Sequence, residues 1–324
     1  MPASSSKIRS VLIGTGAYLP QRILTNRELA ASLDSSDEWI RQRTGISQRH
    51  VSSDSETTTD LATRAAKQAM VNAGIRDPSQ IDLVIVATTT PTDVFPATAT
   101  MVQHFIGASG FAFDLQAVCS GFVYALSVAD SLLQSGSAKT ALVIGAENFT
   151  RLLDWTDRGT CVLFGDGAGA VIVRAEAGKG DQSDRGILTS FLHSDGSLRD
   201  ILYTDGSPGA RVKMEGKEVF RHATEKMAAV AEEALDSLGL QGSDLDWLVP
   251  HQANLRIIEA MAKKLNLPLS KVIVTVDKHA NTSAASIPLA LHAGFSDGRL
   301  KPGQLIMVEA LGGGLTWGSA IIRL

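Results

Sequence analysis

The chain alternates short apolar runs with longer stretches in which apolar residues recur every three or four positions. Short runs of this kind are typical of buried strands, and the longer pattern is typical of amphipathic helices. The strand-like runs cover residues 11–13, 83–87, 141–144, 170–173, 247–249 and 305–308. The helical stretches cover residues 61–73, 122–134, 219–238 and 255–265. Such alternation predicts an α/β fold.

Two segments echo each other along the chain. Residues 80–84 and 244–248 each follow a helical stretch with a glycine near its end, and each opens a strand-like run. Their aspartates, Asp82 and Asp246, are 164 positions apart (246 − 82), about half of the 324 residues. Glycine-rich turns at 165–169 and 312–314 each enter a further strand. The pattern predicts a duplicated fold, with halves at residues 1–175 and 176–324.

Two long segments stand outside this alternation. Residues 176–217 are rich in Gly, Asp and Ser with short strand-like pieces, so we expect them to connect the halves and to form surface loops. Residues 19–59 carry many charges around Trp39. Long ordered loops in α/β proteins often build binding sites, so this segment is a candidate binding region.

The composition narrows the class of protein. Hydrophobic residues make up 44% and charged residues 20%, which is ordinary for a globular chain that folds by itself. The net charge of -4 supplies no overall positive field for nucleic acid or an anionic membrane. No apolar stretch is long enough for a signal peptide or a membrane span. We therefore expect a cytoplasmic protein that binds neither nucleic acid nor membrane.

The cysteines are the first candidates for chemistry. Cys119 and Cys161 have neither paired nor metal-like spacing, which argues against a disulfide framework and a metal site. Cys119 lies between a strand-like run at 111–115 and a helix, among small residues that would admit a substrate. A helix N-terminus favours the nucleophilic thiolate. A buried structural cysteine is the alternative, and for Cys161 we keep that interpretation.

Two more polar residues follow strand-like runs. His251 follows residues 247–250, and Asn281 follows residues 272–276. Active sites of open α/β sheets form at the carboxyl ends of strands, so His251 and Asn281 are expected near Cys119. Taken singly, they are more often a structural histidine and a helix cap. Together with Cys119, they indicate nucleophilic acyl chemistry.

Glycine-rich stretches do not indicate a cofactor site. Gly14 and Gly16 begin like a dinucleotide fingerprint, but Leu19 stands where a third glycine is needed. The glycines at 165–169 are better explained by close backbone packing than by a phosphate site. No cofactor is expected.

The chain resembles the β-ketoacyl-acyl-carrier-protein synthase III family of thiolase-like condensing enzymes. The similarity runs nearly end to end, through motifs at residues 14–20, 36–40, 156–160, 251–254, 281–286 and 312–318. It implies a five-layer αβαβα fold, a homodimer and a Cys119–His251–Asn281 triad. It further implies acyl transfer from acyl-CoA to Cys119, followed by decarboxylative condensation with malonyl-acyl carrier protein at the start of type II fatty acid synthesis. Acetyl-CoA is the first choice of primer.

The resemblance also assigns the surrounding residues. Backbone N–H groups of Cys119 and Gly313 would hold the oxyanion. Trp39, Arg43 and Arg158 would bind CoA, with Trp39 and Arg158 on the two faces of the adenine. A core tryptophan and ordinary surface arginines are the alternative. A basic patch for the acidic carrier protein would consist of Arg221, Arg256 and Lys263, for which a solvated helix face is the alternative.

The sequence departs from the family near the acyl pocket. Ala280 replaces the glycine usual before the asparagine, and Leu311 stands where relatives often carry Phe. Phe95 matches the residue that lines the partner's acyl pocket across the dimer. These differences leave longer or branched primers open.

Other functions use similar residues. A Cys-His-Asn set also serves acyl hydrolases, which release free acid from acyl-CoA. A CoA-binding protein without catalysis would never become acylated. A condensing enzyme that primes a polyketide or quinolone pathway would share all of these residues and differ in pocket shape.

Overall fold

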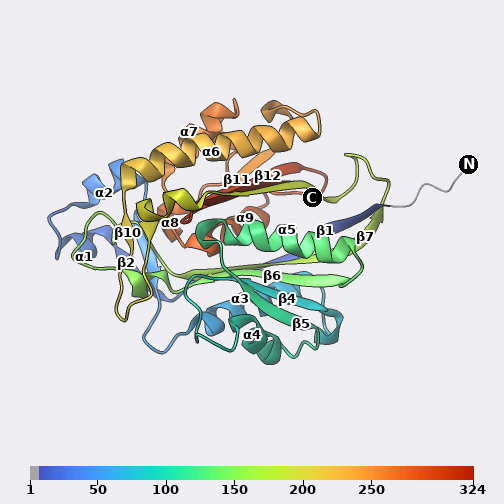
Figure 1. Cartoon of the computed structure of the whole chain (residues 1–324), viewed down its shortest axis with the longest axis horizontal. Helices are drawn as coiled ribbons and strands as arrows, with labels where there is room; N and C mark the ends of the chain where they lie inside the picture. Colours follow the sequence, from blue (N-terminus) through green and yellow to red (C-terminus); the bar gives the residue numbers. More distant parts are fainter. Residues whose placement is uncertain (1–6) are drawn as a thin grey trace, which may run out of the picture.

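Two β-sheets, each lying between two layers of helices, form the body of the protein in the computed structural model, which describes residues 7–324 (Figure 1). Helices α3 and α4 cover the outer face of the first sheet, and α6 and α7 cover the outer face of the second. Helices α5 and α9 lie between the sheets. The five layers are those of the predicted thiolase-like α/β fold.

The first sheet has the strand order β1-β7-β6-β4-β5, and the second has the order β11-β12-β13-β8. In the first sheet β4 is parallel to β5 and β6, and β7 is antiparallel to β6 and β1. In the second, β11 is parallel to β12, and the remaining pairs are antiparallel. The strands are β1 (Lys7–Tyr18), β4 (Leu83–Ala87), β5 (Phe111–Leu115), β6 (Thr140–Glu147), β7 (Gly167–Gly178), β8 (Gly186–Ser194), β11 (Trp247–Pro250), β12 (Leu305–Gly312) and β13 (Thr316–Arg323). Two small ribbons pair β2 (Arg22–Thr25) with β3 (Gln48–Val51), and β9 (Leu202–Tyr203) with β10 (Lys213–Met214).

The helices at the four stretches that periodicity predicts begin and end close to the expected positions. The helices are α1 (Asn26–Ala30), α2 (Asp37–Thr44), α3 (Thr58–Asn72), α4 (Thr98–Ile106), α5 (Gly121–Gln134), α6 (Gly216–Ser237), α7 (Leu255–Lys264), α8 (Val276–His279) and α9 (Ser286–Ser296). The start of α3 is fixed by a capping box, in which the Thr57 hydroxyl accepts the Asp60 N–H and the Asp60 carboxylate accepts the Thr57 N–H. None of these helices is long and apolar enough to cross a membrane within residues 7–324.

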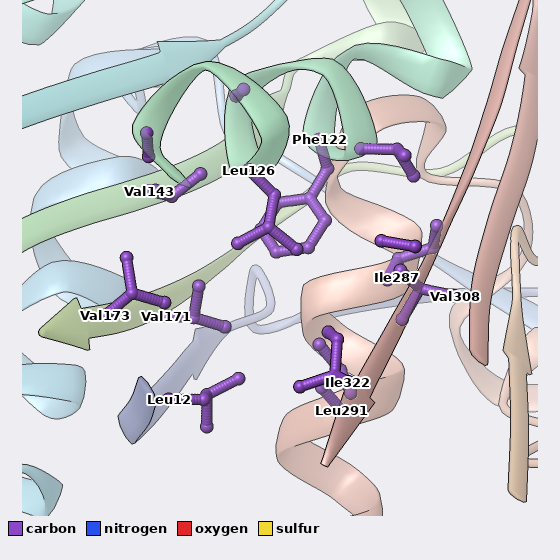
Figure 2. Packing of buried hydrophobic residues seen from close by; sticks show 14 of the residues in the cluster. Leu12, Phe122, Leu126, Val143, Val171, Val173, Ile287, Leu291, Val308 and Ile322 are labelled. Carbon is purple, nitrogen blue, oxygen red and sulfur yellow. The ribbon is translucent and has the colours of Figure 1, made fainter. Parts of the chain in front are cut away.

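The central core joins the two sheets. Figure 2 shows Phe122 and Leu126 of α5 beside Ile287 and Leu291 of α9, with Val171 of β7 on the first sheet. Because both faces of the central layer are covered by sheets, its helices bury apolar side chains on every side. The core holds the start of α5 and the start of α9 at fixed positions.

Two sequence-based expectations about elements are wrong. Residues 272–276 form no strand: Val272 makes one isolated bridge to Leu248, and Val276 begins α8. The Gln252 side chain supplies the hydrogen bonds that a neighbouring strand would otherwise give this segment. Residues 176–217 are more than a connection, because they include all of β8, which pairs along β13 in the second sheet.

The glycine-rich stretches lie where backbones approach closely. Gly14 and Gly16 are inside β1, and a Cβ on Gly16 would lie 2.2 Å from the carbonyl oxygen of Ala65 in α3. A Cβ on Gly169 would lie 2.5 Å from the Leu289 nitrogen of α9. The prediction of close packing at residues 165–169 is confirmed, and Gly14 and Gly16 form no phosphate-binding turn.

Candidate active site

A cavity of about 570 Å³ brings the three predicted catalytic residues together. Cys119, His251 and Asn281 all line it, and their exposed fractions are only 4%, 3% and 6%. The exposed side chains of Arg43 and Arg158 line the same cavity. The cavity therefore runs from the basic outer surface to a buried inner end that carries the thiol, the imidazole and the carboxamide.

Cys119 lies in the 3₁₀ turn η2 (Val118–Ser120), directly before α5. Val118 has a φ of 50°, a left-handed conformation that is costly for a β-branched residue and that recurs at functional sites. Burial raises the pKa of the Cys119 thiol to about 12. The helix N-terminus was expected to favour a thiolate, but desolvation dominates in this structure. The thiol must therefore lose its proton when it reacts.

His251 is held by α9. Its Nδ1 lies 2.6 Å from the Ser286 hydroxyl, and that oxygen accepts the Gln252 N–H at 3.3 Å. Since the hydroxyl oxygen already accepts one hydrogen bond, its own proton is available to Nδ1, and the imidazole proton is then on Nε2. Burial lowers the pKa of His251 to about 3, so the ring is neutral. A neutral imidazole can donate one hydrogen bond from Nε2.

Gln252 fixes the end of β11 to the segment before Asn281. Its Nε2 donates to the carbonyls of Pro250 and Ile273 at 2.8 and 3.0 Å. Its Oε1 accepts the N–H groups of Thr275 and Val276 at 2.8 and 3.1 Å. The side chain is fully buried, and these contacts satisfy both amide hydrogens and both acceptor positions. The Gln252 side chain therefore holds the end of β11, next to His251, rigidly against residues 273–276, which precede Asn281.

Asn281 follows Ala280, which has a φ of 58°. The backbone of Asn281 bonds residues on both sides, with its N–H to the Leu163 carbonyl and its carbonyl to the Gly165 N–H. Its Oδ1 accepts the Ser283 N–H at 2.9 Å. Because the oxygen is used in this way, the side-chain NH₂ group is the part of Asn281 that remains to donate.

Sequence reasoning missed the residues that orient the triad. Ser286 and Gln252 occur in the motif stretches 281–286 and 251–254, but their roles depend on contacts across the fold. Their position within those motifs was the available signal.

The predicted CoA residues lie beside the same cavity. The guanidinium carbons of Arg43 and Arg158 lie 4.8 and 5.3 Å from the centre of the Trp39 ring. Arg158 also forms an ion pair with Asp34 at 3.2 Å. The arrangement places an aromatic face and two cations within one partly exposed area, which suits a nucleotide with phosphates.

The remaining predicted residues are spread around this area. Leu311 and Arg256 line the cavity, whereas Phe95 is 84% exposed on the loop between β4 and α4. Arg221 is exposed on α6 and pairs with Glu218 at 2.7 Å. Lys263 is exposed in the last turn of α7. Gly313 follows β12 in the turn to β13, and a Cβ on its neighbour Gly312 would lie 2.7 Å from the Cys119 nitrogen.

The two cysteines are free thiols, and neither is part of a metal site. Cys119 and Cys161 are both buried. Within residues 7–324, no group of three or more His, Cys, Asp or Glu side chains could hold a metal ion.

Comparisons with known proteins agree with this geometry. Residues 113–196 match the model of 3-oxoacyl-(acyl-carrier-protein) synthase III, and residues 235–324 match the model of its C-terminal part. The chain is 63% identical over 98% of its length to β-ketoacyl-(acyl-carrier-protein) synthase III of Paramagnetospirillum magneticum, of which it covers 99%. The relative from Rhodospirillum centenum is 56% identical, again over 98% of this chain and 99% of the relative.

Comparison with solved structures indicates the same family. The 3-oxoacyl-(acyl-carrier-protein) synthase III of Aquifex aeolicus superposes with a TM-score of 0.92 at 46% identity, covering 97% of this chain and 100% of that chain. The priming β-ketosynthase of the R1128 polyketide pathway has a TM-score of 0.91 at 34% identity, covering 98% of this chain and 97% of that one. With this cavity, these motifs and this likeness over its whole length, the chain belongs to the β-ketoacyl-(acyl-carrier-protein) synthase III family of acyltransferases.

Proposed function

We propose that this enzyme condenses an acyl-CoA primer, with acetyl-CoA as the first choice, with malonyl-acyl carrier protein and so starts type II fatty acid synthesis. The observation that carries the proposal is one cavity lined by a thiol, a neutral imidazole and a carboxamide whose oxygen is already hydrogen-bonded. A thiol can hold the acyl group, and two neutral donors can stabilise an enolate. No cofactor is needed for either step.

The first half-reaction transfers the acyl group. The sulfur of Cys119 attacks the thioester carbonyl, CoA leaves, and an acyl-enzyme remains. The developing oxyanion is held by the backbone N–H groups of Cys119 and Gly313. The close approach of Gly312 to the Cys119 nitrogen supports the use of these two N–H groups together, because it brings the turn at residues 312–314 next to Cys119.

The second half-reaction forms the carbon–carbon bond. Loss of CO₂ from the malonyl thioester puts negative charge on the thioester oxygen. His251 Nε2–H and the Asn281 NH₂ group donate to that oxygen, and the resulting carbanion attacks the acyl group on Cys119. A neutral histidine suits this role, since it donates a hydrogen bond without adding a buried charge.

CoA and carrier protein are proposed to bind at the outer end of the cavity. The adenine stacks on Trp39 and displaces the Arg158 guanidinium, which lies 5.3 Å from the ring centre in this structure, to the other face of the base, and Arg43 lies near the phosphates. Arg221, Arg256 and Lys263 form the basic patch for the acidic carrier protein. The exposed apolar pair Val94 and Phe95, at 97% and 84% exposure, supports a homodimer in which Phe95 lines the partner's acyl pocket.

A priming role in polyketide synthesis is the second candidate. The solved priming ketosynthase shares the fold and 34% of aligned residues, whereas the synthase III relative shares 63%. The higher identity favours fatty acid synthesis. A hydrolase is separated from both by its product, because it releases free acid and needs no malonyl thioester.

The decisive experiment is intact-protein mass spectrometry after incubation with a panel of acyl-CoAs, followed by addition of malonyl-acyl carrier protein. We expect one acyl adduct on the wild type and on Cys161→Ser, and none retained on Cys119→Ser. Cys161 is the matched control because it is the chain's other buried free thiol. A wild type that stays unlabelled with every primer, or that gives only free acid, would contradict the proposal.

A further inference from the structure

A buried serine separates the nucleophile from a buried carboxylate. The 3₁₀ turn η7 (Ser283–Ala285) packs against η2, which carries Cys119, and against β6, which ends at Glu147. The contact with β6 is very close, since a Cβ on Gly145 would lie 2.1 Å from the Ala284 carbonyl oxygen. Ser283 is therefore held between the turn of Cys119 and the strand of Glu147.

The Ser283 hydroxyl has no hydrogen-bond partner among the described residues. The residue is fully buried, and its Oγ makes no hydrogen bond of ordinary length within residues 7–324. Its φ is 49°, and its N–H is used by the Asn281 side chain. A buried, unpartnered hydroxyl on a left-handed residue costs free energy on both counts. Such a cost at the centre of a site points to a role in the reaction.

Glu147 is fully buried and surrounded by donors. Its carboxylate accepts hydrogen bonds from the hydroxyls of Thr88 and Thr90, at 3.4 and 2.6 Å, and from the Thr89 N–H at 3.1 Å. The Thr90 oxygen accepts the Asn148 N–H at 2.9 Å, so its proton is directed to the carboxylate. These donors favour the ionised carboxylate, whereas burial favours the acid. The balance leaves the pKa of Glu147 at about 7.

The three groups act on one another. The Ser283 hydroxyl lowers the pKa of both the Cys119 thiol and the Glu147 carboxyl group, and the Glu147 charge raises that of the thiol. The buried thiol must give its proton to some base before it attacks. His251 is a poor candidate, because its pKa is about 3 and its Nδ1 already contacts Ser286.

We propose that Ser283 and Glu147 form a proton relay behind Cys119, a proposal that rests on the acyl transfer proposed above. As the Cys119 sulfur attacks the thioester, its proton passes to Ser283 Oγ, and the Ser283 hydroxyl proton passes to the Glu147 carboxylate. When the carbon–sulfur bond to CoA breaks, the Glu147 proton passes back to Ser283 Oγ, and the Ser283 hydroxyl proton passes to the CoA thiolate. The products are acyl-enzyme and CoA thiol, and Glu147 is again ionised. Ser283 lies between the turn that carries the reacting sulfur and the strand that ends at Glu147, and Glu147 acts through it.

The test measures the two half-reactions separately. Ser283→Ala and Glu147→Gln should each slow single-turnover acylation of Cys119 by about a hundredfold, the usual contribution of acid–base catalysis. Both should keep malonyl decarboxylation, measured as CO₂ release without primer, within about twofold, because that step does not use the thiol proton. Glu147→Asp, which retains a carboxylate, should recover part of the acylation rate. The double variant should be no slower than the slower single variant, since the two groups act in series.

A matched pair formed by Ser10 of β1 and Asp130 of α5 controls for loss of a buried contact. The Ser10 hydroxyl donates to the buried Asp130 carboxylate at 2.6 Å, and Asp130 lies about 13 Å along α5 from the start of the helix, next to Cys119, at 1.5 Å per residue. Ser10→Ala and Asp130→Asn should leave both half-reactions unchanged. If Glu147→Gln fails to fold, Ser283→Ala, which removes a single oxygen, decides the question.

The outcomes separate the relay from the proposed function. Acylation within twofold of wild type in Ser283→Ala, or an equal loss of acylation and decarboxylation in both relay variants, would overturn the relay. A wild type that becomes acylated but forms no β-ketoacyl thioester with malonyl-acyl carrier protein would contradict the proposed function and leave the acylation test of the relay intact.

Discussion

The Nδ1 atom of His251 lies 2.6 Å from the hydroxyl oxygen of Ser286, so the first residue of α9 determines which imidazole nitrogen carries the proton. Helix α9 is fixed between the two sheets, and the orientation of the ring is therefore set by the central core.

Removing this hydroxyl should weaken decarboxylation selectively. In Ser286→Ala the buried Nδ1 loses its partner, and the ring can adopt the tautomer that no longer donates from Nε2. We expect malonyl decarboxylation to fall by about tenfold, equal to about 1.4 kcal/mol. Acylation of Cys119 should change little. Release of CO₂ and single-turnover acylation measure the two effects, and an unchanged rate of CO₂ release would show that Ser286 does not set the tautomer.

The donors themselves should have a larger effect. His251→Ala and Asn281→Ala each remove one hydrogen bond to the developing enolate, and loss of an oxyanion donor costs about 2.7 to 4 kcal/mol. Decarboxylation should therefore fall by orders of magnitude, while acyl transfer from CoA continues to a useful degree. If decarboxylation survived both substitutions, the assignment of His251 and Asn281 as donors would be wrong.

The proximity of Cys119, His251 and Asn281 could be predicted from sequence because each follows a strand-like run. The runs before Cys119 and His251 form β5 and β11, and both residues line the cavity. Asn281 was placed correctly for a partly wrong reason, since the run before it is not a strand. Its position comes from the Gln252 side chain, and no periodic pattern reports a single side chain that replaces strand pairing.

Glu147 shows a second limit of pattern reading. The predicted strand stops at residue 144, because the glycine and the glutamate that follow interrupt the apolar run. In the structure β6 continues to Glu147, which is fully buried. Charged residues are rarely buried, so a pattern based on polarity assigns them to the surface. The threonines that make burial possible lie more than fifty positions earlier and cannot be paired with Glu147 from spacing alone.

The Trp39 prediction concerns binding of CoA. Trp39→Ala removes the aromatic ring that Arg43 and Arg158 both contact, and base–aromatic stacking contributes about 1 to 3 kcal/mol. We expect the KM for acyl-CoA to rise about tenfold or more, with a small change in kcat. Trp155→Ala is the control, because Trp155 is also partly exposed but is not among the described residues that line the cavity. Equal effects of the two substitutions would argue against a role in CoA binding.

Ala280 has a backbone conformation that favours glycine. A non-glycine residue with a φ of 58° costs about 1 to 3 kcal/mol. Glycine would remove this strain but lose about 0.5 to 1 kcal/mol through chain entropy and about 0.8 kcal/mol through the buried methyl group. Ala280→Gly should therefore change the free energy of unfolding by less than about 2 kcal/mol. Ala280→Val should lose at least about 2 kcal/mol, because its branched side chain is strained there and the site is fully packed. Urea denaturation measures the stability of both variants. An Ala280→Val variant as stable as the wild type would contradict the argument that the backbone at Ala280 is strained.

Glu309 should make the stability of the protein depend on pH. Its side chain is fully buried, its carboxyl oxygens have no partner within residues 7–324, and burial raises its pKa from 4.5 to about 8. Between these values the folded chain retains a proton that the unfolded chain releases. Stability therefore falls as pH rises from 4.5 to about 8, by up to about 1.4 kcal/mol per pH unit. Glu309→Gln should lack this dependence of stability on pH. Urea midpoints that change with pH in the same way for the wild type and the variant across that range would contradict the prediction.

The cavity that holds Cys119 also sets the order of events. Cys119 is only 4% exposed and lines the same cavity as His251 and Asn281. In the proposed reaction, the primer thioester and the extender thioester cannot occupy this cavity together. The first carrier must depart before the second arrives, so the geometry imposes alternation between two substrates and gives parallel lines in a double-reciprocal plot.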